Sequence, residues 1–200
     1  PSTGDALYYK DILDAEGKPT GERTVTNLWS QATYYYHGSA IPKISGGLTN
    51  SLRYKNFDLS VLVTFAVGGK FYDGNYFALM HRGAYGTAWH EDILERWQQP
   101  GDVTNVPRVQ NGVADNDGAS TRWLFDADYL NIKNVTLSYT LPRTLLSRAG
   151  ISGVQIFGNI DNAYLFTKHK GMDPQRSFTG TSDWSFTPFR TITFGATVNL

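Results

Sequence analysis

Long runs of alternating apolar and polar residues constrain this chain more than any other feature. In the last run, FRTITFGATVNL, one side of the alternation holds Ile192, Phe194, Ala196, Val198 and Leu200. The residues between them are Thr, Gly and Asn. A period of two predicts a β-strand with one apolar and one polar face. The pattern continues to the last residue, so the strand is expected to reach the end of the chain.

Four further runs predict the rest of a sheet. KISGGLTNSLRYK and NFDLSVLVTFAVGG alternate in the same way and are separated only by residues near Lys55 and Asn56, which predicts an antiparallel hairpin. YLNIKNVTLSYTLP and GVQIFGNIDNAYLFT predict two more strands. The sequence therefore predicts about five strands of roughly ten residues. Their connections are short at 55–56, moderate at 142–152, and long at 68–120 and 167–188.

The remaining segments predict loops with little helix. Residues 1–40 read as a loop region, with glycines and a proline as turn markers. In AWHEDILERWQQPGD, Trp89, Ile93 and Trp97 recur at a spacing of four, and Pro100 follows, which predicts one short helix. PRTLLSRAGI reads as a connector with one helical turn.

Composition excludes several classes of protein. The chain of 200 residues has no cysteine, which excludes disulfides, thiolate metal sites and a cysteine nucleophile. Its formal net charge is zero, so nothing supports nucleic-acid binding. No apolar run approaches the ~18 residues of a membrane-spanning helix. Aromatic residues make up 14% of the chain, which suits either a membrane interface or a sugar-binding surface.

Strand length favours an outer-membrane barrel over a soluble sandwich. Strands of soluble proteins average about five or six residues, whereas strands of about ten residues with alternating short turns and long loops are typical of membrane barrels. A barrel needs about eight strands to close. We therefore expect this chain to be the end of a larger barrel, its last strand pairing with a first strand outside the chain, because a polar tail or a free edge in hydrocarbon is costly.

Four motifs, in order along the chain, resemble those of the SusC/RagA family of TonB-dependent transporters. The first is the hairpin IPKISGGLTNSLRYKNFDLSVLVTFAVGGKFYD, followed by the loop WQQPGDVTNVPR. STRWLFDADYLNIKNVTLSYTLP and GNIDNAYLFTKHKGMDP resemble the next two. The resemblance runs from about residue 40 to the end, while residues 1–39 match loosely. Barrels of this family often end in Phe, and this chain ends in Leu200.

The resemblance implies a fold and a function. The fold is all-β: an antiparallel transmembrane β-barrel segment, about five C-terminal strands of a plugged barrel of about 22 strands, with long extracellular loops and one short helix. Residues 1–40 form an extracellular loop region, and residues 41–200 form the C-terminal strands and loops. The function is import of large nutrients, oligosaccharides or peptides, across the bacterial outer membrane. The implied partners are a SusD-like surface lipoprotein and TonB, the latter through a missing N-terminal part. No cofactor and no catalysis are implied.

Two sets of residues are candidates for contacts. On the outward faces of the strands, lipid contact is expected for Val61, Val63, Phe65, Leu137, Ile156, Ile192, Phe194 and Val198. In the long loops, contact with substrate or with the lid lipoprotein is expected for Tyr85, Trp89, Trp97, Trp184 and Phe186. The alternative for these rings is packing within the loops or membership of an aromatic belt.

Other residue clusters carry weaker hypotheses. His81, His90 and Glu91 lack the spacing of a zinc motif. Asp11, Asp14 and Glu16 resemble a calcium loop without its full ligand pattern.

Glu91 and Asp92 are adjacent on the predicted helix and point apart. Asp126 and Asp128 share one face of a strand but have no evident reason for split pKa values, so glycosidase chemistry is disfavoured. The main alternative for the whole chain is a soluble, secreted all-β carbohydrate-binding or adhesion module.

Overall fold

The computed structural model of the chain consists of two compact units. It describes residues 3–111, 115–146, 150–169, 171–182, 184 and 186–199. Residues 1–38 and 72–124 form one unit, here called the loop unit, and residues 39–71 and 125–200 form the other, here called the sheet unit. In the part of the chain that is described, no helix has the length and apolar composition needed to cross a membrane.

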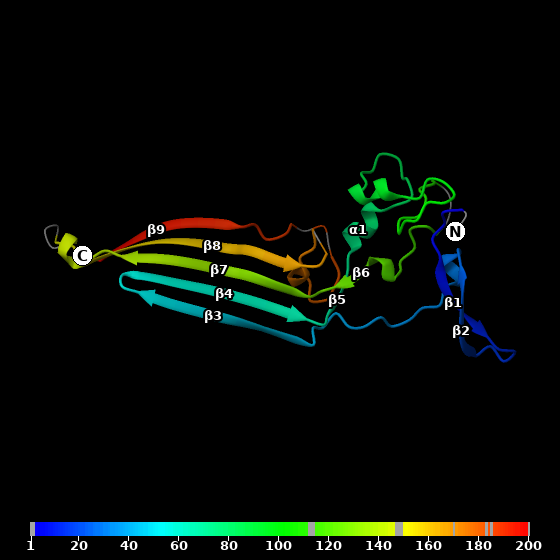
Figure 1. Ribbon diagram of the computed structural model, residues 1–200, viewed down its shortest axis with the longest axis horizontal. Helices are drawn as coiled ribbons and strands as arrows, with labels where there is room; N and C mark the ends of the chain where they lie inside the picture. Colours follow the sequence, from blue (N-terminus) through cyan, green and yellow to red (C-terminus); the bar gives the residue numbers. More distant parts are fainter. Residues whose placement is uncertain are drawn as a thin grey trace. The chain divides into compact units, whose positions relative to one another are not determined.

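The sheet unit is built on five long antiparallel strands, side by side in Figure 1. They are β3 (Ile44–Tyr54), β4 (Phe57–Val67), β7 (Tyr129–Thr140), β8 (Gly153–Thr167) and β9 (Thr191–Asn199), and they pair in the order β3-β4-β7-β8-β9. This confirms the predicted all-β antiparallel fold with five long strands. Among the described residues β3 and β9 each have one neighbour, so the sheet is open. Leu200 lies outside the described residues.

Cross-strand register gives this sheet one apolar and one polar face. Val63 lies opposite Leu48 and Ile132, and Ile160 lies opposite Val135 and Ile192. Directly opposite residues share a face. By this register, the apolar face holds all the residues expected to face lipid: Val61, Val63, Phe65, Leu137, Ile156, Ile192, Phe194 and Val198.

A β-bulge keeps the apolar residues of β7 on that face. Against β4 the register of β7 shifts between Ile132 and Asn134, which makes Lys133 the extra residue. Against β8 the register shifts at the same place, where Asn162 and Ala163 lie opposite Lys133. The alternation in the sequence changes at the same point. Before the shift the apolar residues Leu130 and Ile132 are at even positions, and after it Val135 is at an odd position. Without the extra residue, a slip of one position would turn half of the strand over.

Hydrogen-bonded side chains cover the polar face. The amide of Asn134 donates to Asn159 and to Asp161, both at 2.7 Å. Thr136 Oγ1 donates to Asn159 Oδ1 at 2.8 Å, and Gln155 donates to Ser138 at 3.1 Å. This face is thus polar and almost without Lys or Arg, as expected for a surface that meets water.

Phenylalanine rings lie over glycines across neighbouring strands. Phe157 pairs with Gly195, and Phe194 pairs with Gly158. A Cβ added at Gly195 would lie 2.5 Å from the end of the Phe157 ring, and one at Gly158 would lie 3.3 Å from the Phe194 ring. The absence of a side chain is therefore what lets each ring lie flat against the sheet.

The loop unit carries its own hairpin and a small core. Its elements are β1 (Tyr8–Leu13), β2 (Pro19–Thr26), α1 (Gly74–Leu79) and the 3-10 helices η1 (Trp29–Gln31), η2 (Glu91–Glu95) and η3 (Thr121–Trp123). Its buried core residues are Met80, Ile93, Val106 and Trp123. Beside this core the Tyr76 hydroxyl donates to Asp92 at 2.7 Å. Burial, and then this hydrogen bond, raises the pKa of Tyr76 to about 12, so the donor keeps its proton at neutral pH.

The structure corrects two details of the sequence prediction. The short helix is α1, where Asp73 caps the backbone N–H groups of Asn75 and Tyr76. The predicted helix at residues 89–99 is only the 3-10 turn η2. It ends at Arg96, whose backbone is no longer helical. Residues 1–40, read as a loop region, contain the β1–β2 hairpin; their extracellular placement stays a prediction.

Short elements complete the chain. β5 (Lys70–Tyr72) and β6 (Leu124–Asp126) form a two-stranded sheet. The connector after β7 contains α2 (Arg143–Leu146), which confirms the predicted helical turn, and η5 (Pro174–Arg176) follows β8. Phe71, Ala127 and Met172 form a second buried cluster, within the sheet unit.

The glycine under Phe157 gives a first testable prediction. Gly195→Ala is expected to lower the free energy of unfolding by about 1–3 kcal/mol, because the new methyl group displaces the ring. Gly47→Ala is the matched control, since its Cβ would meet its nearest atom at 3.4 Å, an ordinary contact. Urea unfolding of the full-length receptor in detergent compares the two, and equal midpoints would contradict the packing described.

Candidate functional site

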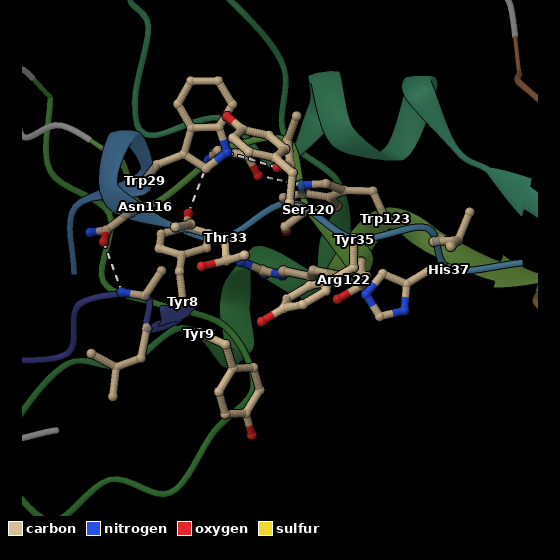
Figure 2. Close-up of a pocket in the computed structure, with 18 of the residues that line it drawn as sticks. Tyr8, Tyr9, Trp29, Thr33, Tyr35, His37, Asn116, Ser120, Arg122 and Trp123 are labelled. Carbon is tan, nitrogen blue, oxygen red and sulfur yellow. Dashed lines mark hydrogen bonds between the residues drawn. The ribbon is translucent and has the colours of Figure 1, made fainter. Parts of the chain in front are cut away.

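The loop unit contains a pocket of about 680 Å³ that could hold a ligand (Figure 2). Its lining comes from segments at 6–9, 29–37, 105–107 and 116–124, together with Tyr72. The rings that line it belong to Tyr8, Tyr9, Trp29, Tyr34, Tyr35, His37, Tyr72 and Trp123. A concave aromatic surface with a few polar groups is the usual form of a small-molecule site.

Backbone hydrogen bonds build the first wall of the pocket. The N–H of Thr33 donates to the carbonyl of Tyr9 at 3.0 Å, and the N–H of Asp11 donates to Thr33 Oγ1 at 2.9 Å. The segment around Thr33 thus occupies the edge of β1 that β2 leaves free. This contact places Tyr35 beside β1. The Tyr35 ring is held by Arg23, whose guanidinium lies 4.3 Å from the ring centroid, and by a hydrogen bond from its hydroxyl to Asp11.

Trp29 forms a second wall over a glycine. Its backbone N–H donates to Asp115 Oδ2 at 2.9 Å, and its indole N–H donates to the carbonyl of Ala119 at 2.8 Å. A Cβ on Gly118 would lie 2.5 Å from the Trp29 ring. Gly118 is therefore required for this close approach. Its N–H donates to the Tyr8 hydroxyl at 3.2 Å.

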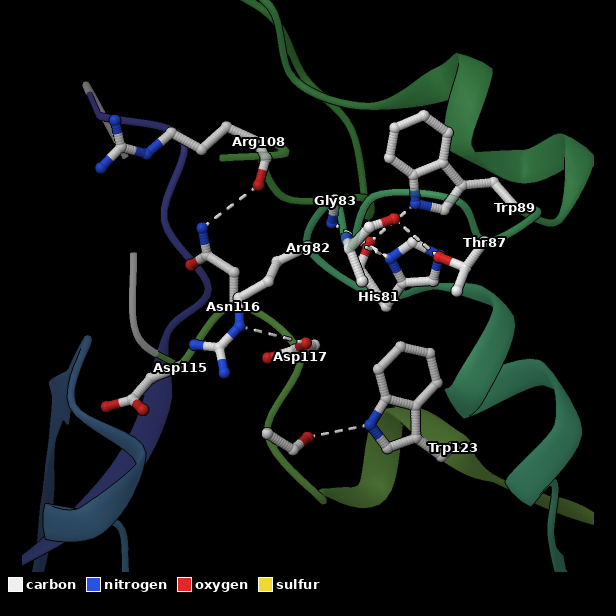
Figure 3. A network of polar contacts seen from close by, with 12 residues as sticks. His81, Arg82, Gly83, Thr87, Trp89, Arg108, Asp115, Asn116, Asp117 and Trp123 are labelled. Carbon is white, nitrogen blue, oxygen red and sulfur yellow. Dashed lines mark hydrogen bonds and ion pairs between the residues drawn. The ribbon is translucent and has the colours of Figure 1, made fainter. Parts of the chain in front are cut away.

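Asn116 ties the N-terminal segment of the pocket to the rest of the unit. Its buried side chain accepts a hydrogen bond from the N–H of Ala6 at 2.9 Å and donates to the carbonyl of Arg108 at 3.2 Å. Figure 3 shows the second of these contacts. The side chain of Arg108 pairs with Asp5 at 2.8 Å. Residues over a hundred positions apart are thereby fixed side by side.

Arg122 and Trp123 close the pocket. Trp123 is fully buried, and its indole N–H donates to the carbonyl of Gly118 at 2.9 Å. The Arg122 guanidinium stacks on this indole, 4.5 Å from the ring centroid. Burial lowers the pKa of Arg122, because a charged group loses hydration there. Burial also raises the pKa of the Tyr8 hydroxyl, which stays protonated at neutral pH.

Two of the predicted contact residues, Tyr85 and Trp89, lie on a loop organised by His81. Figure 3 shows His81 beside Trp89. Nδ1 of His81 accepts hydrogen bonds from the N–H groups of Gly83 and Ala84 at 3.1 and 3.0 Å. The Trp89 ring stacks on the His81 imidazole, with 5.4 Å between the ring centroids. The Trp89 indole N–H donates to the His81 carbonyl at 2.9 Å. Tyr85 is fully exposed, so its ring is free to meet a partner.

The other predicted contact residues have different surroundings. Trp97 packs against Gly4, where a Cβ would lie 2.3 Å from its ring. Trp184 and Phe186 belong to the sheet unit and are largely exposed. The ring centroids of Phe186 and Phe189 are 6.5 Å apart. None of the predicted contact residues lines the aromatic pocket. Their contact with substrate or lid stays a prediction.

The acidic residues weighed as calcium ligands support the β1–β2 hairpin. Asp14 Oδ1 accepts from the N–H groups of Glu16 and Lys18 at 3.0 and 2.8 Å. Asp11 pairs with Arg23 at 3.4 Å. Among the described residues, no group of three or more His, Cys, Asp or Glu side chains has the arrangement of a metal site.

The carboxylates weighed as catalytic pairs also have structural partners. Asp126 pairs with Lys70 at 2.6 Å and with Lys168 at 3.2 Å, and Asp128 accepts from the N–H of Gly68 at 2.7 Å. Hydrogen bonds from the lysines lower the pKa of Asp126. Asp92 accepts from Tyr76, as described above, and His90 caps the N–H of Asp92 at 3.2 Å.

Comparison with known proteins agrees with this fold. TonB-dependent receptor P3 of Formosa agariphila is 30% identical over 141 residues, which are 70% of this chain and 14% of that receptor. TonB-dependent receptor SusC of Bacteroides thetaiotaomicron is 22% identical over 176 residues, 84% of this chain and 16% of SusC. No family model matches the chain.

The structure of the RagAB peptide transporter contains the same fold. It aligns with 98% of this chain at a TM-score of 0.80 and 22% identity, over 21% of its own chain. The fold and the sequence matches define the class, that of TonB-dependent receptors. The chain is a SusC/RagA-like segment of a TonB-dependent receptor, and it spans about a fifth or less of the length of the relatives it matches.

The loop around His81 gives a second prediction. His81→Ala is expected to speed hydrogen exchange at the amides of Gly83 and Ala84 by about tenfold, because both N–H groups lose their acceptor. Tyr85→Ala is the matched control on the same loop, since its exposed ring supports neither amide. Hydrogen-exchange mass spectrometry of the full-length receptor measures both. Unchanged protection in His81→Ala would show that the imidazole does not organise this loop.

Proposed function

We propose that this chain supplies strands and extracellular loops of a TonB-dependent importer of large nutrients in the bacterial outer membrane. The observation that carries the proposal is the two-faced sheet of five long strands, which pairs an apolar face with a polar one along its whole length. In a membrane barrel the apolar face meets lipid and the polar face meets the lumen. The sequence matches to TonB-dependent receptors support the same function.

The proposed cargo is an oligosaccharide or a peptide, taken up together with a SusD-like surface lipoprotein. The matched RagAB structure is that of a peptide importer, which supports a large cargo. We assign contact with cargo or lipoprotein to the loop residues Tyr85, Trp89, Trp97, Trp184 and Phe186. Tyr85 and Phe186 are the most exposed of these rings. Contact with TonB is assigned to parts of the receptor outside this chain.

The experiment that tests this function is fractionation of the source cells combined with uptake. The receptor is followed with an antibody against this segment. A band several-fold larger than 22.3 kDa, in the outer membrane and released only by detergent, is expected. Growth on the nutrient that induces the receptor should be lost when tonB is deleted. A soluble band near 22 kDa would contradict the proposal and favour a secreted carbohydrate-binding or adhesion module.

Lipid contact by the apolar face gives a third prediction. Phe194→Lys is expected to lower the free energy of unfolding in lipid vesicles by about 2–4 kcal/mol, because it places a charge in hydrocarbon. Thr193→Lys is the matched control, since Thr193 neighbours Phe194 on β9 and points to the polar face. Urea unfolding of the receptor in vesicles measures the difference. Equal losses in the two variants would contradict lipid contact at Phe194.

A further inference from the structure

Arg122 lines the aromatic pocket without a carboxylate partner. The other arginines near the pocket have one: Arg23 pairs with Asp11 at 3.4 Å, Arg82 with Asp117 at 3.5 Å and Arg108 with Asp5 at 2.8 Å. Within the described residues, no ion pair or hydrogen bond involves the Arg122 guanidinium, which contacts the Trp123 ring. A cation held in this way is available to an anion from outside.

The acids closest to the pocket are already engaged. Asp115 accepts the backbone N–H of Trp29 through Oδ2 at 2.9 Å, and Asp117 pairs with Arg82. Neither forms an ion pair with Arg122. Burial lowers the pKa of Arg122, which means that its charged form is poorly solvated. A bound carboxylate would offset that loss of hydration.

The stack on Trp123 orients the guanidinium. Its centre lies 4.5 Å from the ring centroid, and Trp123 is itself fixed by its hydrogen bond to Gly118. The N–H donors of a guanidinium lie in its plane and point outward from its edges. Stacking on a ring covers the face of the guanidinium, so the N–H groups at its edges can still donate to a carboxylate. Figure 2 shows Arg122 among the residues that line the pocket, with Thr33 and Tyr35.

The rest of the lining fits a sugar better than a peptide. Tyr9, Tyr34 and Tyr35 contribute aromatic rings, a type of side chain on which the C–H-rich side of a pyranose can stack, and Thr33, Ser120 and Thr121 contribute hydroxyl groups. Peptides often bind by adding a strand to a free sheet edge. Here the second edge of β1 is occupied by hydrogen bonds to the Thr33 segment.

We propose that this pocket binds an oligosaccharide that carries a carboxylate, a uronic acid unit, with Arg122 holding the carboxylate and tyrosine rings stacking on the sugar. The proposal rests on the proposed function and narrows its cargo to acidic glycans. The volume of about 680 Å³ is within the range of sites for small ligands.

The test uses the full-length receptor in detergent and isothermal titration calorimetry. The probes are tetrasaccharides of galacturonic acid, of glucuronic acid and of mannuronic acid, each beside its carboxyl-reduced, neutral counterpart. Binding of at least one acidic probe is expected, and its neutral counterpart should bind much more weakly. Arg122→Gln should lower the affinity for the acidic probe by about tenfold to a hundredfold and leave the affinity for the neutral probe unchanged.

Two further variants keep the result interpretable. Arg122→Lys retains the charge but not the planar donors, and an intermediate loss of affinity is expected. Arg143→Gln, an exposed arginine on α2 of the sheet unit, is the control and should change nothing. If Arg122→Gln fails to reach the outer membrane, Arg122→Lys alone decides, and unchanged affinity in it overturns the proposal.

Other results of the titrations would overturn the proposed ligand. No binding of any acidic probe, equal binding of acidic and neutral probes, or binding of an acidic tetrapeptide in place of the sugars overturns the proposed ligand. Fractionation and tonB-dependent growth are scored separately in the same strains. If the receptor fractionates with the outer membrane and supports growth, but Arg122→Gln does not change its affinity for the acidic probe, the proposed function stands and the proposed ligand of the pocket is wrong.

Discussion

The structure depends on one constraint: a sheet with one apolar and one polar face has to keep its register over the whole length of five strands. On one face the pairings place apolar residues opposite apolar residues, as for Val63 with Ile132 and Ile160 with Ile192. A slip by one residue would exchange the faces of a strand. The bulge at Lys133 shows how the chain meets this constraint, because it restores the phase of β7 where the sequence changes it.

The polar face meets a second requirement, since its groups need partners of their own. Asn134, Asn159 and Asp161 bond to one another across β7 and β8. Amide and hydroxyl groups satisfy one another here without many charges. Such a face tolerates water and cargo alike, which agrees with the proposed lumen.

The strands could be predicted from the sequence, because period-two alternation is a local signal and each strand is long. The β1–β2 hairpin could not, since most of its residues are exposed and show no alternation. The helix predicted at 89–99 was wrong in extent because Ile93 and Trp97 serve different partners. Ile93 enters the core of the loop unit, and Trp97 packs on Gly4. The aromatic pocket needs contacts such as Tyr8 with Gly118. The tyrosine run at 34–36 was the only local signal for that pocket.

The most direct test of the two-faced membrane sheet is a scan of β9 with spin labels. Single cysteines replace residues 191 to 198 in turn in the full-length receptor, in a background without other cysteines, and each label is measured in lipid vesicles. This segment contributes no cysteine of its own. If one face of β9 meets lipid, accessibility to oxygen peaks at 192, 194, 196 and 198, while a water-soluble nickel complex reaches the labels between them. Uniform access of the nickel complex along the strand would contradict a lipid-facing sheet.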